Sequence, residues 1–306
     1  MKYFPLRNSD IQISRIALGT WVFGGTHWGG SKQTDCIKAV HAAIDLGINL
    51  IDTAPIYGAG ISETIIGKAI QNKRSKVILA NKCGLLGKGK NITNNLTAKS
   101  IFTEIEGSLQ RLKTDYIDIY QCHWPDPNTP LKETMTALAE LKKQGKIRYI
   151  GVSNFNNELL EEAEQYAEIT TLQNHYSILD REIETNALPY CRKHNINVLC
   201  YGPLAGGILS GKYTEPPTLE GSDARNFFYK YYKGEKFEQV TKLLEKLREF
   251  KRPLNQIAIN WLLAQSGVSS VLVGARNAEQ VKQNVEATTW TLSDNEIKII
   301  KQNTIC

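Results

Sequence analysis

Short apolar runs alternate along the chain with longer segments in which apolar residues recur at helical spacing. Segments 33–46, 100–112 and 131–143 are amphipathic, and the last is followed by Gly145, a residue type that commonly ends a helix. Alternating β and α units favour a parallel sheet, and eight strands apolar on both faces favour its closure into a (β/α)₈ barrel. The alternative is an open doubly wound sheet. The expected strands are 16–18, 48–51, 77–80, 116–121, 147–152, 169–172, 196–200 and 270–273.

Both ends of the chain depart from this repeat. Residues 3–13 alternate apolar and polar side chains around a polar turn at 7–10, which predicts a β-hairpin. Ser293 followed by Glu296 is typical of a helix N-terminus. A short C-terminal helix is therefore expected to run to about residue 303.

One interval between strands is unusually long. Residues 201–270 are rich in glycine and proline and contain a helical pattern at 235–250, which we interpret as a long functional loop plus an extra helix. A length of 306 residues would suit two domains, but one α/β barrel accommodates about 250 residues plus insertions. The expected fold of residues 1–306 is therefore a single α/β domain. It is a TIM barrel with an N-terminal hairpin and extra helices after strand seven and at the C-terminus.

The distribution of charge argues against a nucleic-acid partner. The net charge of +6 is spread along the chain, whereas nucleic-acid binders concentrate basic residues in a patch. We interpret the excess as solvated surface charge or a local anion site. Residues 1–5 are not followed by the apolar core of a signal peptide, and no apolar run approaches the ~18 residues of a membrane span. The prediction is a cytoplasmic protein with no membrane partner.

Cysteines are sparse and form no CxxC pair, which is typical of reduced intracellular thiols. No zinc site or other metal site is expected. The six are Cys36, Cys83, Cys122, Cys191, Cys200 and Cys306.

Polar residues of chemically useful types follow strand after strand. A single Asp or Asn after a strand is usually a turn or a helix cap, but seven consecutive strand ends of this kind are hard to explain as caps. In a parallel barrel these ends lie on one rim, where barrel active sites are built. They are Asp52, Asn81-Lys82, His123, Ser153-Asn154, Gln173-Asn174, Tyr201 and Gly274-Ala275-Arg276.

Asp52, Tyr57, Lys82 and His123 form the catalytic candidates of this rim. The stem of Lys82 begins in apolar surroundings, and a buried ammonium needs a partner, for which Asp52 is the natural candidate. A lysine cation is expected to lower the pKa of Tyr57 from about 10, so that the phenol can donate a proton. His123 can donate a second hydrogen bond to the same substrate oxygen. These four residues suit the reduction of a carbonyl, whose oxygen gains negative charge. The alternative interpretation is that Asp52 and Lys82 form a structural ion pair and that Tyr57 is a packed aromatic ring.

These residues and their surroundings resemble the aldo-keto reductases, in particular a bacterial-type branch that includes inositol-locus and general-stress reductases. The resemblance covers essentially the whole chain and implies Tyr57 as general acid, Lys82 and Asp52 as its tuning pair, and His123 as the residue that orients the carbonyl. Its motifs are Asp52-Thr53-Ala54-x-x-Tyr57-Gly58, Lys82-Cys83-Gly84, Leu109-x-Arg111-Leu112-x-Thr114-Asp115-Tyr116-Ile117-Asp118, His123-Trp124-Pro125-Asp126, Gly151-Val152-Ser153-Asn154-Phe155, Tyr201-Gly202-Pro203-Leu204, Gly211-Lys212-Tyr213 and Gly274-Ala275-Arg276.

Two familiar nucleotide motifs do not fit the chain. No GxGxxG follows a strand, so a Rossmann site is unsupported. Residues 206–212 match GxxxxGK, but Tyr213 stands where Ser or Thr would bind magnesium. The anion site that barrels form after strands seven and eight fits better, because glycines there let backbone N–H groups approach a phosphate and Lys212 adds charge.

The resemblance implies NADPH as cofactor. Its pyrophosphate is expected near residues 204–212, and its adenosine end near Arg276, Gln280 and Asn284. Arg276 would bind the 2′-phosphate, because a guanidinium meets phosphate with a planar pair of donors. The expected cofactor-binding residues are Gly19, Thr20, Trp21, Ser153, Asn154, Gln173, Tyr201, Gly202, Pro203, Leu204, Gly206, Gly207, Gly211, Lys212, Gly274, Ala275, Arg276, Gln280 and Asn284. Ser153, Asn154 and Gln173 would hold the nicotinamide carboxamide, and Tyr201 would stack on its ring.

The expected partner is a small-molecule carbonyl substrate, with Trp21 and Trp124 in its pocket because each adjoins a strand end. A second hypothesis is a cofactor-binding regulatory protein, since potassium-channel β subunits resemble the same family. A third hypothesis is a hydrolase built on the barrel. That function would require paired catalytic carboxylates at strand ends, and Asp52 is the one carboxylate among the strand-end residues given above. The sequence carries no signal for an oligomeric state.

Overall fold

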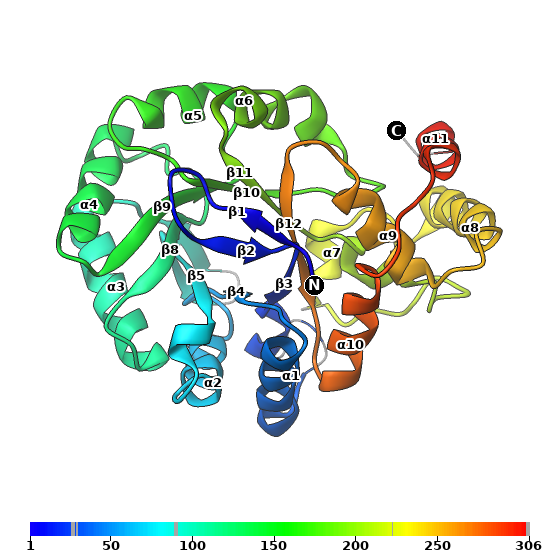
Figure 1. Ribbon diagram of the computed structural model, residues 1–306, viewed down its shortest axis with the longest axis horizontal. Helices are drawn as coiled ribbons and strands as arrows, with labels where there is room; N and C mark the ends of the chain where they lie inside the picture. The colour runs from blue at the N-terminus through cyan, green and yellow to red at the C-terminus, as the bar shows by residue number, and fades with distance from the viewer. Residues whose placement is uncertain (26–27, 29, 89–90, 222, 304–306) are drawn as a thin grey trace.

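The computed structural model describes residues 1–25, 28, 30–88, 91–221 and 223–303. Its centre is a closed barrel of eight parallel strands in which the last strand pairs with the first (Figure 1), so the predicted (β/α)₈ barrel is confirmed. All eight expected apolar runs overlap these strands. They are β3 (Ile16–Gly19), β4 (Leu50–Asp52), β5 (Ile78–Cys83), β8 (Ile117–Cys122), β9 (Ile147–Ser153), β10 (Thr171–His175), β11 (Asn197–Tyr201) and β12 (Val268–Gly274).

Helices surround the barrel and cover the outer face of its strands (Figure 1). They are α1 (Gln33–Asp45), α2 (Ile61–Ala69), α3 (Ala98–Leu112), α4 (Leu131–Lys143), α5 (Asn157–Glu164), α6 (Ala187–His194), α9 (Leu254–Leu263) and α10 (Ala278–Glu286). The long interval after β11 adds a short 3₁₀ segment η5 (Ala205–Ser210), α7 (Arg225–Phe228) and the expected extra helix α8 (Gly234–Arg248). The C-terminal helix is α11 (Asp294–Gln302), which begins at the expected Ser293–Glu296 capping box.

The hydrophobic core has two layers, because successive side chains of a strand point to opposite faces of the barrel. The outer layer joins the strands to the apolar faces of the helices. The inner layer fills the barrel and contains Ala17, Leu50, Ile78, Ala80, Ile119, Leu199 and Leu272, together with Leu6 and Ile13 from the N-terminal segment.

The predicted N-terminal hairpin closes one end of the barrel. Strands β1 (Tyr3–Pro5) and β2 (Gln12–Ser14) pair antiparallel and lie across the barrel end that faces the viewer in Figure 1. Leu6 and Ile13 are buried in the inner layer. Asn197, at the start of β11, fastens the hairpin in place. Its Oδ1 accepts from the Arg7 N–H at 2.7 Å, and its Nδ2 donates to the Pro5 carbonyl at 2.9 Å.

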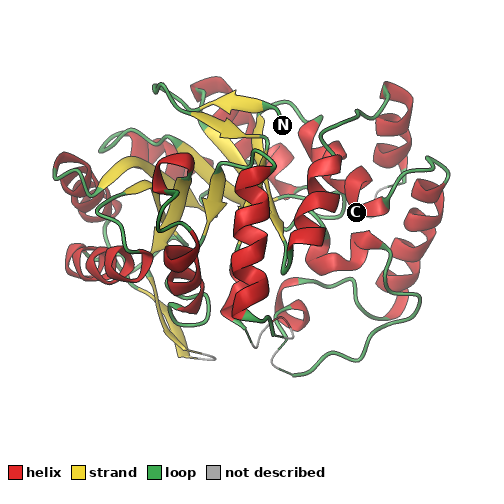
Figure 2. Ribbon diagram, turned by 60° about the horizontal axis from the view of Figure 1, so that its bottom comes forward, coloured by secondary structure: helices red, strands yellow, loops and turns green. Residues whose placement is uncertain are grey.

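A second hairpin was not expected from the sequence. Strands β6 (Leu85–Lys88) and β7 (Asn91–Asn94) pair antiparallel after β5. In Figure 2 this hairpin projects from the end of the barrel opposite the N-terminus. Gly84 leads into it with φ +93°, and a Cβ there would lie 2.3 Å from Leu96 Cδ2, so the bend requires glycine.

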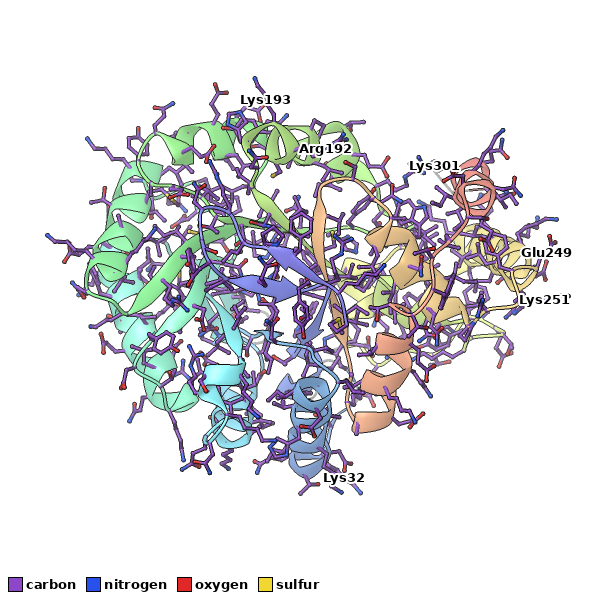
Figure 3. The ribbon with its side chains drawn as sticks, in the orientation of Figure 1. Lys32, Arg192, Lys193, Glu249, Lys251 and Lys301 are labelled. Atoms are coloured by element: carbon purple, nitrogen blue, oxygen red, sulfur yellow. The ribbon has the colours of Figure 1, made fainter. Side chains whose placement is uncertain are left out.

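Charged side chains are spread around the outside of the molecule, in agreement with the interpretation of the net charge as a solvated surface. Lys193, Glu249 and Lys301 in Figure 3 project from the periphery. Among the described helices, none combines the length and the apolar composition needed to cross a bilayer. The described cysteines are buried and have free thiols, and Cys306 lies outside the described residues.

Asn197→Ala is expected to lower the free energy of unfolding by about 1–3 kcal/mol, because it removes two part-buried hydrogen bonds that hold the hairpin backbone to β11. Urea denaturation measures this change. Asn303→Ala, the same substitution at an exposed position, should change the free energy of unfolding by no more than about 0.5 kcal/mol. Equal effects of the two substitutions would show that Asn197 does not fasten the hairpin.

Candidate active site

The four catalytic candidates converge at the C-terminal rim of the barrel around one ammonium group. Lys82 Nζ donates to Asp52 Oδ1 at 2.6 Å, to the Thr53 backbone carbonyl at 3.0 Å and to the Tyr57 hydroxyl at 3.2 Å. His123 packs edge-on against Tyr57, with ring centroids 5.7 Å apart. Lys82 is 0% exposed, so these three oxygens replace water around its charge.

Neighbouring parallel strands bring these residues together. Asp52 ends β4, and Lys82 lies on the adjacent β5. His123 follows β8 on the other side of β5, and its backbone N–H donates to the Cys83 carbonyl at 2.9 Å. Parallel strands present their carboxyl ends at one edge, so residues distant in the chain meet there.

The loop that carries Tyr57 is held close to the 3₁₀ segment η1 (Trp21–Gly24) by two facing glycines. Gly58 has φ +65°, and a Cβ on it would lie 2.4 Å from the Gly24 carbonyl oxygen. A Cβ on Gly24 would in turn lie 2.6 Å from the Gly58 nitrogen. This close approach folds the loop back, so that the Tyr57 hydroxyl reaches Lys82.

The electrostatic environment keeps the phenol of Tyr57 protonated. Burial, and after it the charge of Asp52, raises the pKa of Tyr57 well above its ordinary value. The lowering expected from the Lys82 cation is therefore wrong, because burial penalises the phenolate and Asp52 repels it. Burial also lowers the pKa of Lys82, although Asp52 opposes this shift. For His123, burial and then the Lys82 cation lower the pKa well below its ordinary value, so its imidazole is neutral.

The second oxygen of Asp52 is held from the far side of the barrel. Gln173, on β10, donates its Nε2 to Asp52 Oδ2 at 2.7 Å, and Gln121 Nε2 lies 3.5 Å from the same oxygen. The amide nitrogen of Gln173 is thus engaged in the charged cluster. The contact of Gln173 with a nicotinamide carboxamide stays a prediction.

A cavity of about 990 Å³ opens above the four residues. The expected site residues that line it are Gly19, Thr20, Trp21, Asp52, Tyr57, His123, Trp124, Ser153, Asn154, Gln173, Tyr201, Gly202, Pro203, Leu204, Gly206, Gly207, Lys212, Gly274, Ala275, Arg276 and Gln280. Three expected residues do not line it. Lys82 lies beneath its floor, Gly211 faces Leu254, and Asn284 is buried with its Oδ1 3.5 Å from Asn255 Nδ2.

Ser153, Asn154 and Tyr201 form one rigid wall of the cavity. The Tyr201 hydroxyl donates to Asn154 Oδ1 at 2.9 Å. Asn154 Nδ2 in turn lies 3.0 Å from both the His123 carbonyl and Ser153 Oγ. The hydrogen bonds tie the wall directly to the backbone of His123.

Basic side chains gather at another part of the cavity, on the loops after β11 and β12. In η5, Gly206 and Gly207 have φ values of +70° and +103°, and a Cβ on Gly207 would lie 3.5 Å from Lys212 Nζ. The Arg276 guanidinium donates to the Trp28 carbonyl, and the Arg276 backbone N–H donates to Gln280 Oε1 at 2.8 Å. These loops therefore offer cations and closely approachable backbone in one place.

The mouth of the cavity is apolar. Trp21 stacks on Tyr57 with ring centroids 5.9 Å apart, and Phe228 packs edge-on against Trp21 at 5.2 Å. The exposed large apolar side chains that line the cavity are Ile61, Ile92, Trp124, Phe227 and Phe228. Trp124 was expected there from the sequence, whereas Ile61 and Ile92 were missed. For Ile92, the glycine-rich segment 84–94 was the signal that a hairpin brings it to the rim.

Comparison with known proteins agrees with this geometry. The model of the aldo/keto reductase family matches residues 15–304. The chain is 43% identical to the aldo-keto reductase YhdN of Bacillus subtilis (strain 168), over 100% of this chain and 95% of that protein. It is 38% identical to the NADH-specific methylglyoxal reductase of Escherichia coli (strain K12), over 99% of this chain and 98% of that protein.

Solved structures of similar fold carry related names. A glycerol dehydrogenase from Gluconobacter oxydans superposes with a TM-score of 0.90 and 36% identity, covering 98% of this chain and 94% of that one. The holo form of an aldo-keto reductase from Bacillus halodurans gives a TM-score of 0.85 and 32% identity, covering 100% of this chain and 97% of that one.

The imidazole of His123 is expected to remain neutral as the pH falls through 6.5, because its pKa lies well below that value. NMR of the labelled histidine ring, assigned with a His123→Gln variant, checks this. Lys82→Met removes one of the two causes of the shift, so the pKa of His123 should rise while staying below its ordinary value. Titration of His123 near pH 6.5 in the unaltered protein would contradict the expectation.

Proposed function

The chain belongs to the aldo/keto reductase family, whose members are oxidoreductases of carbonyl compounds that use nicotinamide cofactors, and we propose that it reduces aldehydes or ketones with NADPH. One observation carries the proposal. The hydroxyl of a protonated Tyr57 lies 3.2 Å from Nζ of the fully buried Lys82 and beside a neutral His123, with Tyr57 and His123 lining one cavity and Lys82 beneath its floor.

The residues present fit a nicotinamide dinucleotide. The turn at Gly206 and Gly207 has a backbone conformation that side chains other than glycine rarely adopt, and Lys212 and Arg276 supply positive charge near it. We expect this region to hold the phosphates. Tyr201 is expected to face the nicotinamide ring and to hold it beside Tyr57. When bound, the cofactor supplies the hydride that reduces the carbonyl carbon.

Side chains of the protein supply the proton for the carbonyl oxygen and stabilise the negative charge that results. The Tyr57 hydroxyl donates its proton to the carbonyl oxygen of the substrate, and Lys82 stabilises the resulting phenolate. Asp52 fixes the position of Lys82 and keeps it charged. The neutral His123 donates a hydrogen bond to the same carbonyl oxygen and orients it, while Trp21, stacked on Tyr57, shields the reacting atoms from water.

The apolar mouth of the cavity indicates which class of substrate fits. The described charged side chains that line the cavity are Asp52, which is paired with Lys82, and Lys212, Arg225 and Arg276, which lie on the loops after β11 and β12. The mouth itself presents Ile92, Trp124 and Phe228. We therefore propose an uncharged carbonyl substrate with an apolar substituent. The regulatory alternative is not favoured, since the relatives named above are reductases and a dehydrogenase.

Loss of the absorbance of reduced nicotinamide tests this function directly. Benzaldehyde, hexanal and glyceraldehyde serve as substrates, with NADPH and NADH as donors. Oxidation of NADPH with the two apolar aldehydes at higher kcat/KM than with glyceraldehyde supports the proposal. Absence of oxidation with all three, under conditions in which NADPH binds, would reject the reductase function.

Tyr57→Phe is expected to lower kcat by about 10² to 10⁴ while leaving NADPH affinity within about twofold, because it removes the proton donor and keeps the ring. Steady-state kinetics and fluorescence titration measure the two quantities. Tyr3→Phe, a tyrosine outside the cavity, is the matched control and should change neither. Turnover of Tyr57→Phe near that of the unaltered protein would remove Tyr57 from its role.

Arg276→Ala is expected to weaken NADPH binding about ten- to a hundredfold and to leave NADH nearly unchanged, since a charge-assisted hydrogen bond contributes roughly 1.5–3 kcal/mol. Fluorescence titration with NADPH and with NADH measures the two affinities. Arg252→Ala, an exposed arginine that does not line the cavity, is the control. Equal weakening of both cofactors would mean that Arg276 supports the loop through the Trp28 carbonyl and does not bind the 2′-phosphate.

A further inference from the structure

His175 lies directly behind the wall residue Tyr201. Their rings stack with centroids 5.2 Å apart and planes 19° from parallel. Tyr201 lines the cavity and His175 does not, so the imidazole supports the face of the phenol ring that is turned away from the cavity. His175 ends β10 and Tyr201 ends the neighbouring β11, where the two are register partners.

A carboxylate lies close to the imidazole. His175 Nε2 is buried and lies 3.7 Å from Asp180 Oδ2, longer than a hydrogen bond but within reach of an electrostatic contact. Asp180 is itself anchored, because its Oδ1 accepts from the Tyr231 hydroxyl at 2.9 Å and its Oδ2 from Ser177 Oγ at 3.1 Å. An anchored carboxylate therefore lies beside the imidazole without a hydrogen bond to it.

The segment that follows η5 packs against the same imidazole. Tyr229 lies edge-on to His175 with centroids 5.6 Å apart. Gly202, which joins Tyr201 to the turn, has φ +70°, and a Cβ there would lie 2.5 Å from His175 Cδ2. His175 thus packs against Tyr201, which is expected to stack on the nicotinamide, and against Gly202 and Tyr229.

We propose that His175 is a positioning residue that holds the Tyr201 ring in place to receive the nicotinamide ring. This inference rests on the proposed function. Tyr201 is fixed at its tip by the hydrogen bond to Asn154 and on its rear face by His175. A ring fixed in both ways loses less conformational entropy when it stacks on a ligand, so it binds that ligand more tightly.

Separate titrations with the two halves of the cofactor distinguish this role from a general effect on folding. Reduced nicotinamide mononucleotide probes the Tyr201 end, and adenosine 2′-monophosphate probes the Arg276 end; calorimetric titration measures both dissociation constants without turnover. His175→Ala should weaken the nicotinamide half about two- to tenfold, the range expected for an aromatic pair, and leave the adenosine half unchanged. His175→Phe keeps a flat ring against Tyr201 and should restore binding of the nicotinamide half.

The chain provides a matched control. His194 stacks on Tyr190 with centroids 4.1 Å apart and planes 8° from parallel, and neither residue lines the cavity. His194→Ala removes an equivalent stack and should change the affinity of neither half. If His175→Ala does not fold, His175→Asn removes the ring, keeps a polar side chain near Asp180 and carries the same expectation.

Each result decides a different claim. Equal weakening of both halves by His175→Ala, no change in either, or failure of His175→Phe to restore the nicotinamide half overturns the positioning role. If the unaltered protein binds neither half, the proposed nicotinamide cofactor site is wrong, and the role of His175 falls with it.

Discussion

The arrangement of the rim follows from the burial of one positive charge. Lys82 is withdrawn from water, and an unpaired ammonium in such a place would be too costly to persist in the charged form. It therefore needs an anion, and Asp52 supplies it. Asp52 in turn has a second oxygen to satisfy, and Gln173 reaches it from across the barrel. The burial of a single charge thus links β4, β5 and β10, and the Tyr57 hydroxyl completes the cluster where it meets the cavity.

This polar rim is compatible with a stable barrel because the two ends of the barrel are different. The end closed by the N-terminal hairpin is filled with apolar side chains and fastened by Asn197. The opposite end carries the charged cluster, the left-handed turns at Gly206 and Gly207, and exposed aromatic side chains. The hairpin end therefore serves the stability of the barrel, and the cluster around the buried Lys82 lies at the opposite end.

The sequence predicted the elements that depend on local pattern. Apolar strands, the amphipathic helices, the Ser293 box and the polar strand ends are all visible in short windows, and the parallel barrel then brings the strand ends together. The direction of the Tyr57 pKa shift was not predictable, because it depends on how deeply the ring is buried. The positions of Gly211 and Asn284 were not predictable either, because they depend on packing against α9. His175 and Tyr201 stand 26 positions apart in the chain, by the difference of their numbers, and only the register of β10 and β11 makes them neighbours.

The hydrogen bonds between the N-terminal hairpin and Asn197 also constrain the order in which the protein folds during synthesis. Arg7 and its partner Asn197 are separated by 190 positions. At about 5–20 residues per second on the ribosome, the hairpin exists for roughly 10 to 40 s before its anchor is synthesised. A lone two-stranded hairpin is at best marginally stable in water, so Leu6 and Ile13 stay without their final packing during this time. The hairpin is therefore translated long before its anchor, and it is among the last elements of the barrel to reach its native packing.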